Sequence, residues 1–284
     1  MATSDAQSSK SPALRVAFLT DTHLPASGRN SQFRKVLDLA QNQYRADVLL
    51  FGGDNVMGVE VQPLAEAKSQ LANWREMISQ TVKVPYASCI GNHDLWGWSS
   101  KGNKDLYTGK RMAMDAFDMP GRYYSFERAG WRFLMLDAIQ PGPYGYSTSI
   151  DEEQFEWLRR EIQKSVLPTL IVSHAPVLSV TGLLMGGPKP GSSSFRVPSH
   201  KYLANSHAIV ELLAERPQVK VCLSGHMHMI DEVKYRGVRH VCGGAVCGGW
   251  WRGPFEKFDP AFVLVDLFKD GGSRHHVIHW DQAS

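Results

Sequence analysis

A tetrapeptide whose side chains are suited to chemistry, Gly91-Asn92-His93-Asp94, follows the apolar run Tyr86 to Ile90. Glycine at the end of a predicted strand allows a sharp turn, and an amide, an imidazole and a carboxylate then stand within three residues. Burying each of these side chains without a partner would cost roughly 2–7 kcal/mol, so their presence favours a functional site. An Asx turn would also use Asn92 or Asp94, so the tetrapeptide alone leaves both interpretations open.

Four further polar clusters also come directly after apolar runs. The runs are residues 15–20, 47–51, 170–173 and 219–223, and the clusters are DTH from 21, GGDN from 52, SHAP from 173 and GHMH from 225. Uninterrupted apolar runs of this length are typical of strands that are covered on both faces. Ligand-type residues therefore follow each of these predicted buried strands.

Two amphipathic helices are predicted between the first three strands. Apolar residues recur at helical spacing over 30–43, behind an Asn30 or Ser31 cap, and over 64–78, which is entered through Pro63. Strands that alternate with helices predict a parallel sheet, and the working residues of such sheets gather at the carboxyl ends of the strands. We therefore expect Asp21, His23, Asp54, Asn92 and His93 to lie on one rim.

The rest of the chain gives weaker patterns. Residues 95–120 have no clear period, residues 122–127 and 131–137 resemble an antiparallel pair, and Ser149 with Glu152 predicts a capping box for a helix. Residues 178–198 are rich in Gly, Pro and Ser and predict a loop or lid, followed by a helix over 200–215. Runs at 232–236, 238–242, 262–267 and 275–280 are expected to complete a second sheet.

Composition places the chain among ordinary globular proteins. It has 284 residues, 43% hydrophobic and 21% charged, with a formal net charge of +3 and no run of basic residues that would indicate nucleic-acid binding. No apolar run is long enough to span a membrane, and residues 1–13 lack the apolar segment of a secretory signal. We predict a disordered tail over 1–13, one domain over 14–284 and a cytoplasmic location. Cys89, Cys222, Cys242 and Cys247 show no zinc-finger pairing, which favours small buried side chains.

The strand-end clusters together supply seven oxygen and nitrogen donors: Asp21, His23, Asp54, Asn92, His174, His226 and His228. Such a set suits two divalent ions of the Mn, Fe, Zn or Mg kind, held about 3.5–4 Å apart by a shared carboxylate. Each donor alone has a structural alternative: Asp21 as a turn former, or His174 as a hydrogen-bonded core histidine. Together these structural alternatives explain the pattern poorly, because separate accidents would all have to place ligand-type residues after buried strands.

DTH at 21, GGDN at 52, GNHD at 91, SHAP at 173 and GHMH at 225 resemble the five ordered motifs of the calcineurin-like metallophosphoesterases, across residues 15–230. The resemblance implies an α/β fold, a four-layer α/β/β/α sandwich of two mixed sheets flanked by helices. It implies that Asp21, His23, Asp54 and His228 hold one metal ion, and that Asp54, Asn92, His174 and His226 hold the other, with Asp54 bridging. It further implies that His93 stands over the phosphate as an acid or a transition-state stabiliser.

The motif details favour small-molecule phosphoesterases within that superfamily, including the class III cyclic-nucleotide phosphodiesterases. Met57 stands where purple acid phosphatases have a tyrosine, and GGDNVMG differs from the GDxVDRG of serine/threonine protein phosphatases. The expected reaction is attack of a hydroxide, activated by the two ions, on the phosphorus of a small-molecule monoester or diester. His93 would protonate the leaving oxygen, with Asp94 as a candidate orienter. The alternative is a non-catalytic protein-binding scaffold on the same fold.

Substrate contacts are predicted from residues that flank the motifs. Aromatic rings could form the wall of a pocket for a base or another flat group, although packing in the core or at the rim is the more frequent use of tryptophan. Arginines could bind a second phosphate or a carboxylate, although a solvated surface position is the more frequent outcome. The candidates are Trp96, Trp98, Trp250, Trp251, Arg111, Arg122 and Arg252.

Overall fold

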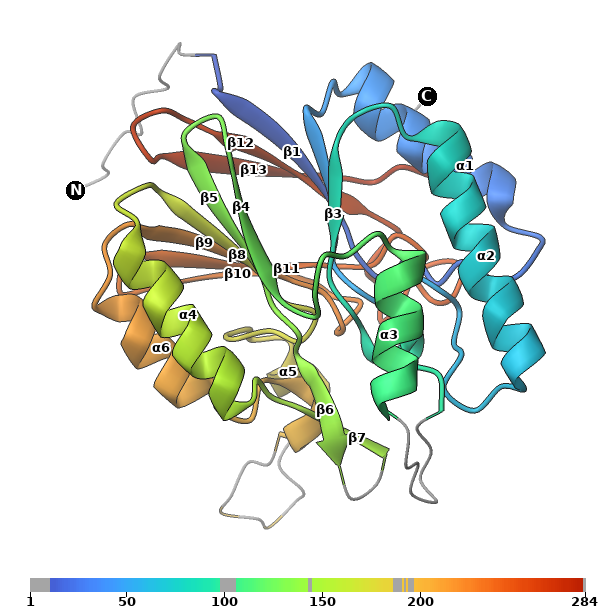
Figure 1. Ribbon diagram of the computed structural model, residues 1–284. Helices are drawn as coiled ribbons and strands as arrows, with labels where there is room; N and C mark the ends of the chain where they lie inside the picture. Colours follow the sequence, from blue (N-terminus) through green and yellow to red (C-terminus); the bar gives the residue numbers. More distant parts are fainter. Residues whose placement is uncertain are drawn as a thin grey trace.

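The computed structural model describes residues 11–97, 106–142, 145–185, 191, 193 and 197–282. Most of the predicted tail, residues 1–10, and the substrate candidate Trp98 lie outside these ranges. Two large mixed sheets stack face to face, and helices cover their outer faces (Figure 1). This arrangement confirms the four-layer α/β/β/α sandwich that was predicted.

The first sheet has five strands in the order β13-β12-β1-β2-β3. Strands β1 (Leu14–Leu19), β2 (Val48–Phe51) and β3 (Tyr86–Ser88) run parallel, as the alternation with helices predicted. Strand β12 (Phe262–Leu267) lies antiparallel to β1, and β13 (Ser273–Ile278) lies antiparallel to β12. The prediction that all the late strands join the second sheet is wrong, because the chain returns to pair β12 with the free edge of β1.

The second sheet has six strands in the order β10-β11-β9-β8-β5-β4. Its parallel centre is formed by β5 (Trp131–Met135), β8 (Thr169–Val172), β9 (Val219–Ser224) and β11 (Val238–Gly243). Strands β4 (Tyr124–Arg128) and β10 (Ile230–Tyr235) are its antiparallel edges, and the predicted β4 and β5 pair is confirmed. A separate hairpin consists of β6 (Ile139–Gly142) and β7 (Gly145–Thr148).

Helices α1 (Asn30–Asp38), α2 (Leu64–Thr81) and α3 (Leu106–Ala116) lie on the side of the first sheet. Helices α4 (Glu152–Lys164) and α6 (Ser206–Ala214) cover the second sheet, as Figure 1 shows. Helix α1 continues into a π-helical segment over Leu39–Gln43, and a short α5 spans Gly182–Met185. Single 3₁₀ turns span Asn92–Asp94 and Ser199–Lys201.

Three helix predictions need correction. Helix α3 lies in the stretch 95–120 that was read as having no clear period. It packs closely on the preceding loop, since a Cβ at Gly109 would lie 2.2 Å from the carbonyl oxygen of Trp96. Helix α4 is capped by Asp151, whose Oδ1 accepts from the backbone N–H of Gln154 at 2.9 Å, and not by Ser149. The N-cap position of α1 is Arg29, which precedes both predicted caps, Asn30 and Ser31, and makes no side-chain capping hydrogen bond.

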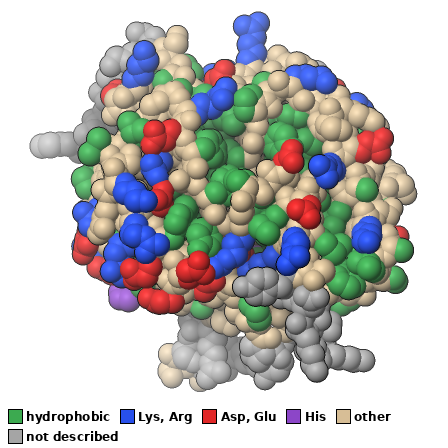
Figure 2. Space-filling model, in the orientation of Figure 1, with side chains coloured by type: hydrophobic (Ala, Val, Ile, Leu, Met, Phe, Trp, Pro, Cys, Tyr) green, Lys and Arg blue, Asp and Glu red, His purple; other side chains and the backbone are tan. Residues whose placement is uncertain are grey.

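Alternation along β1 divides the core into two layers. Val16 and Phe18 point between the sheets, while Ala17 and Leu19 face the helices. Because both faces are covered, β1 needs apolar residues at nearly every position, and this explains its uninterrupted apolar run. All four cysteines are buried and free, as the sequence predicted. Acidic and basic side chains are intermixed on the face shown in Figure 2.

The layer between the sheets gives a direct stability prediction. Phe133 is fully buried in β5 and stacks on Phe126 with ring centroids 4.7 Å apart. We expect Phe133→Ala to lower the free energy of unfolding by about 3–5 kcal/mol, because it leaves a cavity in a close-packed layer. Urea denaturation measures this, with Val166→Ala, at a side chain that is 92% exposed, as the control. A loss below about 1 kcal/mol would contradict this account of the core.

Candidate metal centre

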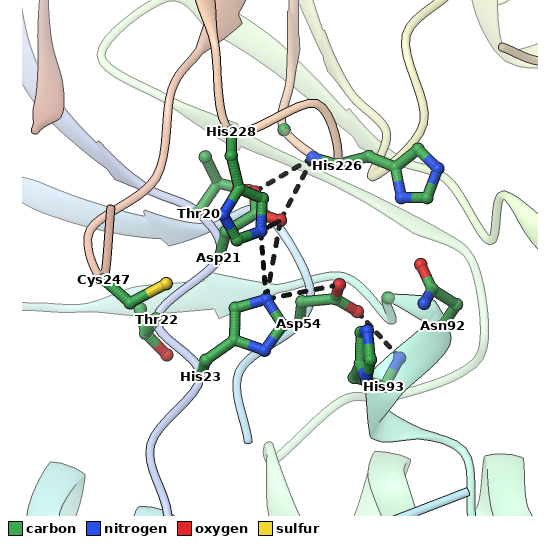
Figure 3. Close-up of polar contacts among 12 residues, drawn as sticks. Thr20, Asp21, Thr22, His23, Asp54, Asn92, His93, His226, His228 and Cys247 are labelled. Carbon is green, nitrogen blue, oxygen red and sulfur yellow. Dashed lines mark hydrogen bonds and ion pairs between the residues drawn. The ribbon is translucent and has the colours of Figure 1, made fainter. Parts of the chain in front are cut away.

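The seven predicted ligands come together at the carboxyl ends of five parallel strands. Asp21 and His23 follow β1, Asp54 follows β2 and Asn92 follows β3. From the second sheet, His174 follows β8, while His226 and His228 follow β9. Figure 3 shows Asp21, His23, Asp54 and His228 close together, with Asn92 and His226 beside them.

One group of donors forms around His23 and His228. The Nε2 atoms of these two rings are 3.2 Å apart, and His228 Nε2 is 3.2 Å from Asp21 Oδ1. His23 Nε2 also lies 3.6 Å from Asp54 Oδ2. Four donor atoms from three loops therefore face one point.

A second group forms on the other side of Asp54. Asp54 Oδ2 is 3.3 Å from His174 Nε2, which in turn is 3.3 Å from Asn92 Oδ1 and 3.2 Å from His226 Nδ1. The same oxygen, Asp54 Oδ2, therefore belongs to both groups.

These distances fit divalent ions. Donors that share one ion with bonds of about 2.1 Å lie roughly 3.0–3.4 Å from each other. Most of the measured separations fall in or near that range, and all seven side chains are at least nine-tenths buried. Two of these pairs, His23 with His228 and His174 with His226, bring ring nitrogens together, and imidazole nitrogens with carboxylate oxygens are a donor set that suits divalent ions.

The four histidines predicted as ligands each contact a backbone carbonyl through the ring nitrogen that faces away from the donor groups. His174 Nδ1 lies 2.9 Å from Gly52 O, and His228 Nδ1 lies 2.7 Å from Gly248 O. His226 Nε2 lies 2.7 Å from His200 O, and His23 Nδ1 lies 3.3 Å from Met57 O. A carbonyl can only accept, so each of these nitrogens is the N–H donor and the opposite nitrogen is free for a metal ion.

The two central carboxylates are fixed in the same way. Thr20 Oγ1 donates to Asp21 Oδ2 at 2.6 Å, and the backbone N–H of His226 donates to the same oxygen at 3.0 Å. The backbone N–H of His93 donates to Asp54 Oδ1 at 2.8 Å, which leaves Oδ2 for the two donor groups. A Cβ at Gly91 would lie 2.1 Å from Asp54 Oδ1, so this position requires glycine for space.

Five of the seven predicted ligands have a left-handed backbone conformation. Asp21, His23, Asp54, His226 and His228 all have positive φ values, between 41° and 67°. The left-handed conformation costs a residue with a side chain of order 1–3 kcal/mol, and it persists where the surrounding structure requires it. Here it turns the chain sharply at the strand ends, so that both members of Asp-x-His and His-x-His reach the centre.

Burial and neighbouring charge set the protonation of the centre. Burial lowers the pKa of His23 and of His226 to about 3, so both rings are neutral at pH 7. Burial also lowers the pKa of His174, but the charge and hydrogen bond of Asp54, together with the Asp21 charge and the Gly52 carbonyl, raise it to about 9. Burial raises the pKa of Asp54, and the nearby histidines, first His174, bring it well below its ordinary value.

This electrostatic arrangement predicts that metal ions displace protons. In the metal-free protein His174 has its pKa raised to about 9, so it holds a proton at pH 7 and loses it as the pH rises through 9. A metal ligand must be neutral, so metal affinity should rise up to about tenfold per pH unit for each proton displaced between pH 6 and 9. Calorimetric titration in two buffers of different ionisation enthalpy measures the proton release. Binding at pH 7 without proton release would contradict this prediction.

Asp94, which the sequence left as a candidate orienter of His93, has a different position. Its Oδ1 accepts from the backbone N–H groups of Asn55 at 2.8 Å and Val56 at 3.1 Å. Its Oδ2 accepts from the Gly91 backbone N–H at 2.8 Å and from Asn55 Nδ2 at 3.2 Å. Asp94 therefore joins the loop after β2 to the loop after β3, and so fixes the distance between Asp54 and Asn92.

Two side chains near the centre, those of Cys247 and Glu60, belong to none of the five motifs. Cys247 Sγ lies within 4.8 Å of ring nitrogens of His23 and His228 and donates to Gly248 O at 3.4 Å. Glu60 Oε1 lies 3.0 Å from His93 Nδ1. Both come from segments outside the five motifs, so no local pattern could place them beside the ligands.

The structure separates the tryptophan candidates. Trp250 is 41% exposed, and its ring centroid lies 4.8 Å from that of His228 and 6.0 Å from that of His23. Trp96 donates from Nε1 to Gln62 O at 2.9 Å, and Trp251 donates from Nε1 to His23 O at 2.9 Å. Trp96 and Trp251 are therefore used in packing and hydrogen bonding, whereas Trp250 offers an open ring beside the centre.

The arginine candidates lie apart from the donor groups. Arg122 forms ion pairs with Asp151 at 2.7 Å, with Glu153 at 3.2 Å and with Asp137 at 3.3 Å. Arg111 is exposed and lines, with Arg122, a cavity of about 410 Å³ between α3 and the β6 strand. Arg252 is exposed next to Trp251.

Comparison with known proteins assigns the family. The model of the calcineurin-like phosphoesterase family matches residues 14–229. The chain belongs to this family and is a metal-dependent hydrolase of phosphoester bonds, as the five motifs predicted.

The similar curated proteins are cyclic-nucleotide phosphodiesterases. A 3′,5′-cyclic-nucleotide phosphodiesterase of Nostoc is 30% identical over 91% of this chain and 89% of its own length. The 3′,5′-cyclic adenosine monophosphate phosphodiesterase of Escherichia coli K12 is 27% identical over 82% of this chain and 76% of its own length.

Solved structures share the fold at low identity. A dimetal phosphatase from Danio rerio has a TM-score of 0.65 with 15% identity, and the match covers 95% of this chain and 99% of that one. GAP50, described as the anchor in the inner membrane complex of Plasmodium, has a TM-score of 0.59 with 14% identity over 95% and 86% of the two chains. These likenesses concern the fold alone.

Among the residues that the structure describes, no helix combines the length and the apolar character that a membrane span requires.

Proposed function

We propose that this chain is a dinuclear phosphodiesterase that acts on small-molecule diesters, with 3′,5′-cyclic nucleotides as the first candidates. The observation that carries the proposal is the pair of four-donor groups that share Asp54 Oδ2. The cyclic-nucleotide phosphodiesterases similar to this chain over most of its length support the choice of substrate. A cytoplasmic location is part of the same proposal.

Seven residues would hold the ions in this proposal. Asp21, His23 and His228 would serve one ion, Asn92, His174 and His226 would serve the other, and Asp54 would serve both. When bound, two divalent ions of the Mn, Fe, Zn or Mg kind supply stabilisation of charge on the phosphoryl oxygens and lower the pKa of an attacking water. The carbonyls behind the histidines keep the donor nitrogens turned inward throughout.

His93 is the proposed acid for the leaving group. Its ring centroid lies 4.9 Å from that of His23, and its backbone N–H is fixed on Asp54 Oδ1. The side chain is 28% exposed, so it faces both the donor groups and the solvent from which a substrate enters. In this position it donates a proton to the departing ester oxygen as the bond to phosphorus breaks.

Trp250 is the proposed contact for the organic part of the substrate. Its exposed ring beside His228 is placed to stack on a base or an aryl group, and such stacking contributes about 1–3 kcal/mol. We expect Trp250→Ala to raise KM for a cyclic nucleotide about tenfold while leaving KM for a dialkyl ester unchanged. Tyr235→Ala, at a side chain that is 47% exposed on β10, is the matched control. An equal change for both esters would contradict the stacking role.

A substrate panel tests the proposed function. The protein is loaded with Mn²⁺ and assayed on an aryl phosphomonoester, an aryl phosphodiester and the cyclic nucleotides. Turnover of the diesters and the cyclic nucleotides is the expected result. Turnover of the monoester alone would overturn the diesterase assignment, and turnover of none would overturn the small-molecule proposal as a whole.

A further inference from the structure

Glu60 lies in the turn between β2 and α2, six residues after Asp54 and outside the five motifs. Its Oε1 lies 3.0 Å from His93 Nδ1, and the two side chains are 18% and 28% exposed. Among the described residues, His93 is the ion-pair partner of the Glu60 carboxylate, and the contact is an ion pair rather than a directed hydrogen bond, because His93 Nδ1 and Glu60 Oε2 are both buried without a hydrogen bond. The mostly buried Glu60 carboxylate therefore pairs with the His93 ring.

The backbone holds this pair from two sides. The Val59 N–H donates to His93 O at 3.0 Å, and the Gly97 N–H donates to Glu60 O at 3.2 Å. Side chains joined through neighbouring backbone hydrogen bonds lose little further entropy when they pair, so the contact differs from a surface ion pair between two flexible side chains.

Gly58 leaves room for the same contact. A Cβ at this position would lie 3.0 Å from Glu60 Oε2 and 3.1 Å from His93 Nδ1. Any larger residue would therefore press on both members of the pair. The turn Gly58-Val59-Glu60 therefore packs against His93 and leaves space for the contact between Glu60 and the His93 ring.

We propose that Glu60 is the positioning residue of His93: it holds Nδ1 and so turns Nε2 away from itself, toward the leaving oxygen of the substrate. This inference rests on the acid role given to His93 in the proposed function. As the bond between phosphorus and the leaving oxygen breaks, its electron pair goes to that oxygen, which takes the proton from His93 Nε2. Glu60 keeps its place at Nδ1 and is not itself protonated, as expected of a carboxylate that orients an imidazole.

A double-mutant cycle tests this role. Glu60→Ala, His93→Ala and the double variant are assayed on a diester with a poor alkoxide leaving group and on one with a good aryl leaving group. We expect Glu60→Ala to lower kcat for the poor leaving group about tenfold, and far less for the good one, because protonation matters less there. In the His93→Ala background, Glu60→Ala should cause no further loss.

Two further variants separate positioning from folding. Glu60→Gln keeps the side-chain volume and an oxygen acceptor, so we expect an intermediate kcat. Glu66→Ala, at an exposed carboxylate in α2, is the matched control and should leave kcat unchanged. Bound metal should equal that of the unsubstituted protein in all of these variants that retain His93.

A spectroscopic readout does not depend on turnover. In metal-free protein labelled with ¹⁵N-histidine, the Nδ1 resonance of His93, assigned by its loss in His93→Ala, should shift in Glu60→Ala and stay in place in Glu66→Ala. An unchanged resonance in Glu60→Ala would overturn the inference. A slow His93→Ala enzyme with a fast Glu60→Ala enzyme would overturn this inference alone, whereas a fast His93→Ala enzyme would overturn the proposed acid as well.

Discussion

Asp54→Ala is expected to abolish both hydrolysis and metal binding. Asp54 Oδ2 lies in both donor groups, 3.6 Å from His23 Nε2 and 3.3 Å from His174 Nε2. Its loss removes the shared ligand, so we expect residual activity below about 0.1% of the original and a fall in bound metal at both positions. Metal content by plasma mass spectrometry, together with kcat/KM, measures the two effects.

The control for this substitution is an exposed carboxylate. Asp38 lies on the surface of α1, and Asp38→Ala should keep both metal content and activity. Circular dichroism shows whether the Asp54→Ala protein is folded, which separates loss of a ligand from loss of structure. A folded Asp54→Ala protein that still bound two ions would refute the bridging role.

His93→Ala should separate the two effects, with the metal ions retained and kcat lowered. The His93 ring stands beside the donor groups, while its backbone N–H holds Asp54 Oδ1 and does not depend on the side chain. A general acid contributes about 10²- to 10⁴-fold, so we expect kcat for a cyclic nucleotide to fall within that range. The loss should shrink for an aryl leaving group that departs without a proton.

His207→Ala, at an exposed histidine of α6, controls for removal of an imidazole. Measurement of kcat for a series of diesters with leaving groups of increasing pKa gives the dependence that an acid produces. If the metal-loaded His93→Ala enzyme matched the original across this series, His93 would have no part in protonation.

The clustering of the seven predicted ligands was predictable because each of these residues is tied to a local pattern. Asp21, Asp54 and Asn92 each follow an apolar run that is typical of a covered strand, and parallel strands bring their ends to one rim. The sequence therefore placed these side chains near each other before any contact was known. The order of the strands was harder to predict. The pairing of β12 with β1 joins residues about 250 positions apart, and neither segment has a local pattern that indicates its partner.

Contacts between loops that are far apart in the chain could not be predicted from the sequence. Glu60 reaches His93 across 33 positions, and Cys247 approaches His228 from the turn after β11. Neither residue type is unusual at its position, so packing alone decides its surroundings. The same holds for Trp250 and Trp251, which are neighbours in the chain but differ in use: the first ring is open, and the second donates to His23 O.

The central claim is that two divalent ions occupy the two donor groups that share Asp54. Anomalous diffraction from crystals of the Mn²⁺-loaded protein tests it most directly. The account predicts two peaks, both about 2.0–2.3 Å from an oxygen of Asp54, one beside His23 and His228 and the other beside His174 and His226. A single peak, or two peaks of which one lies away from Asp54, would contradict it.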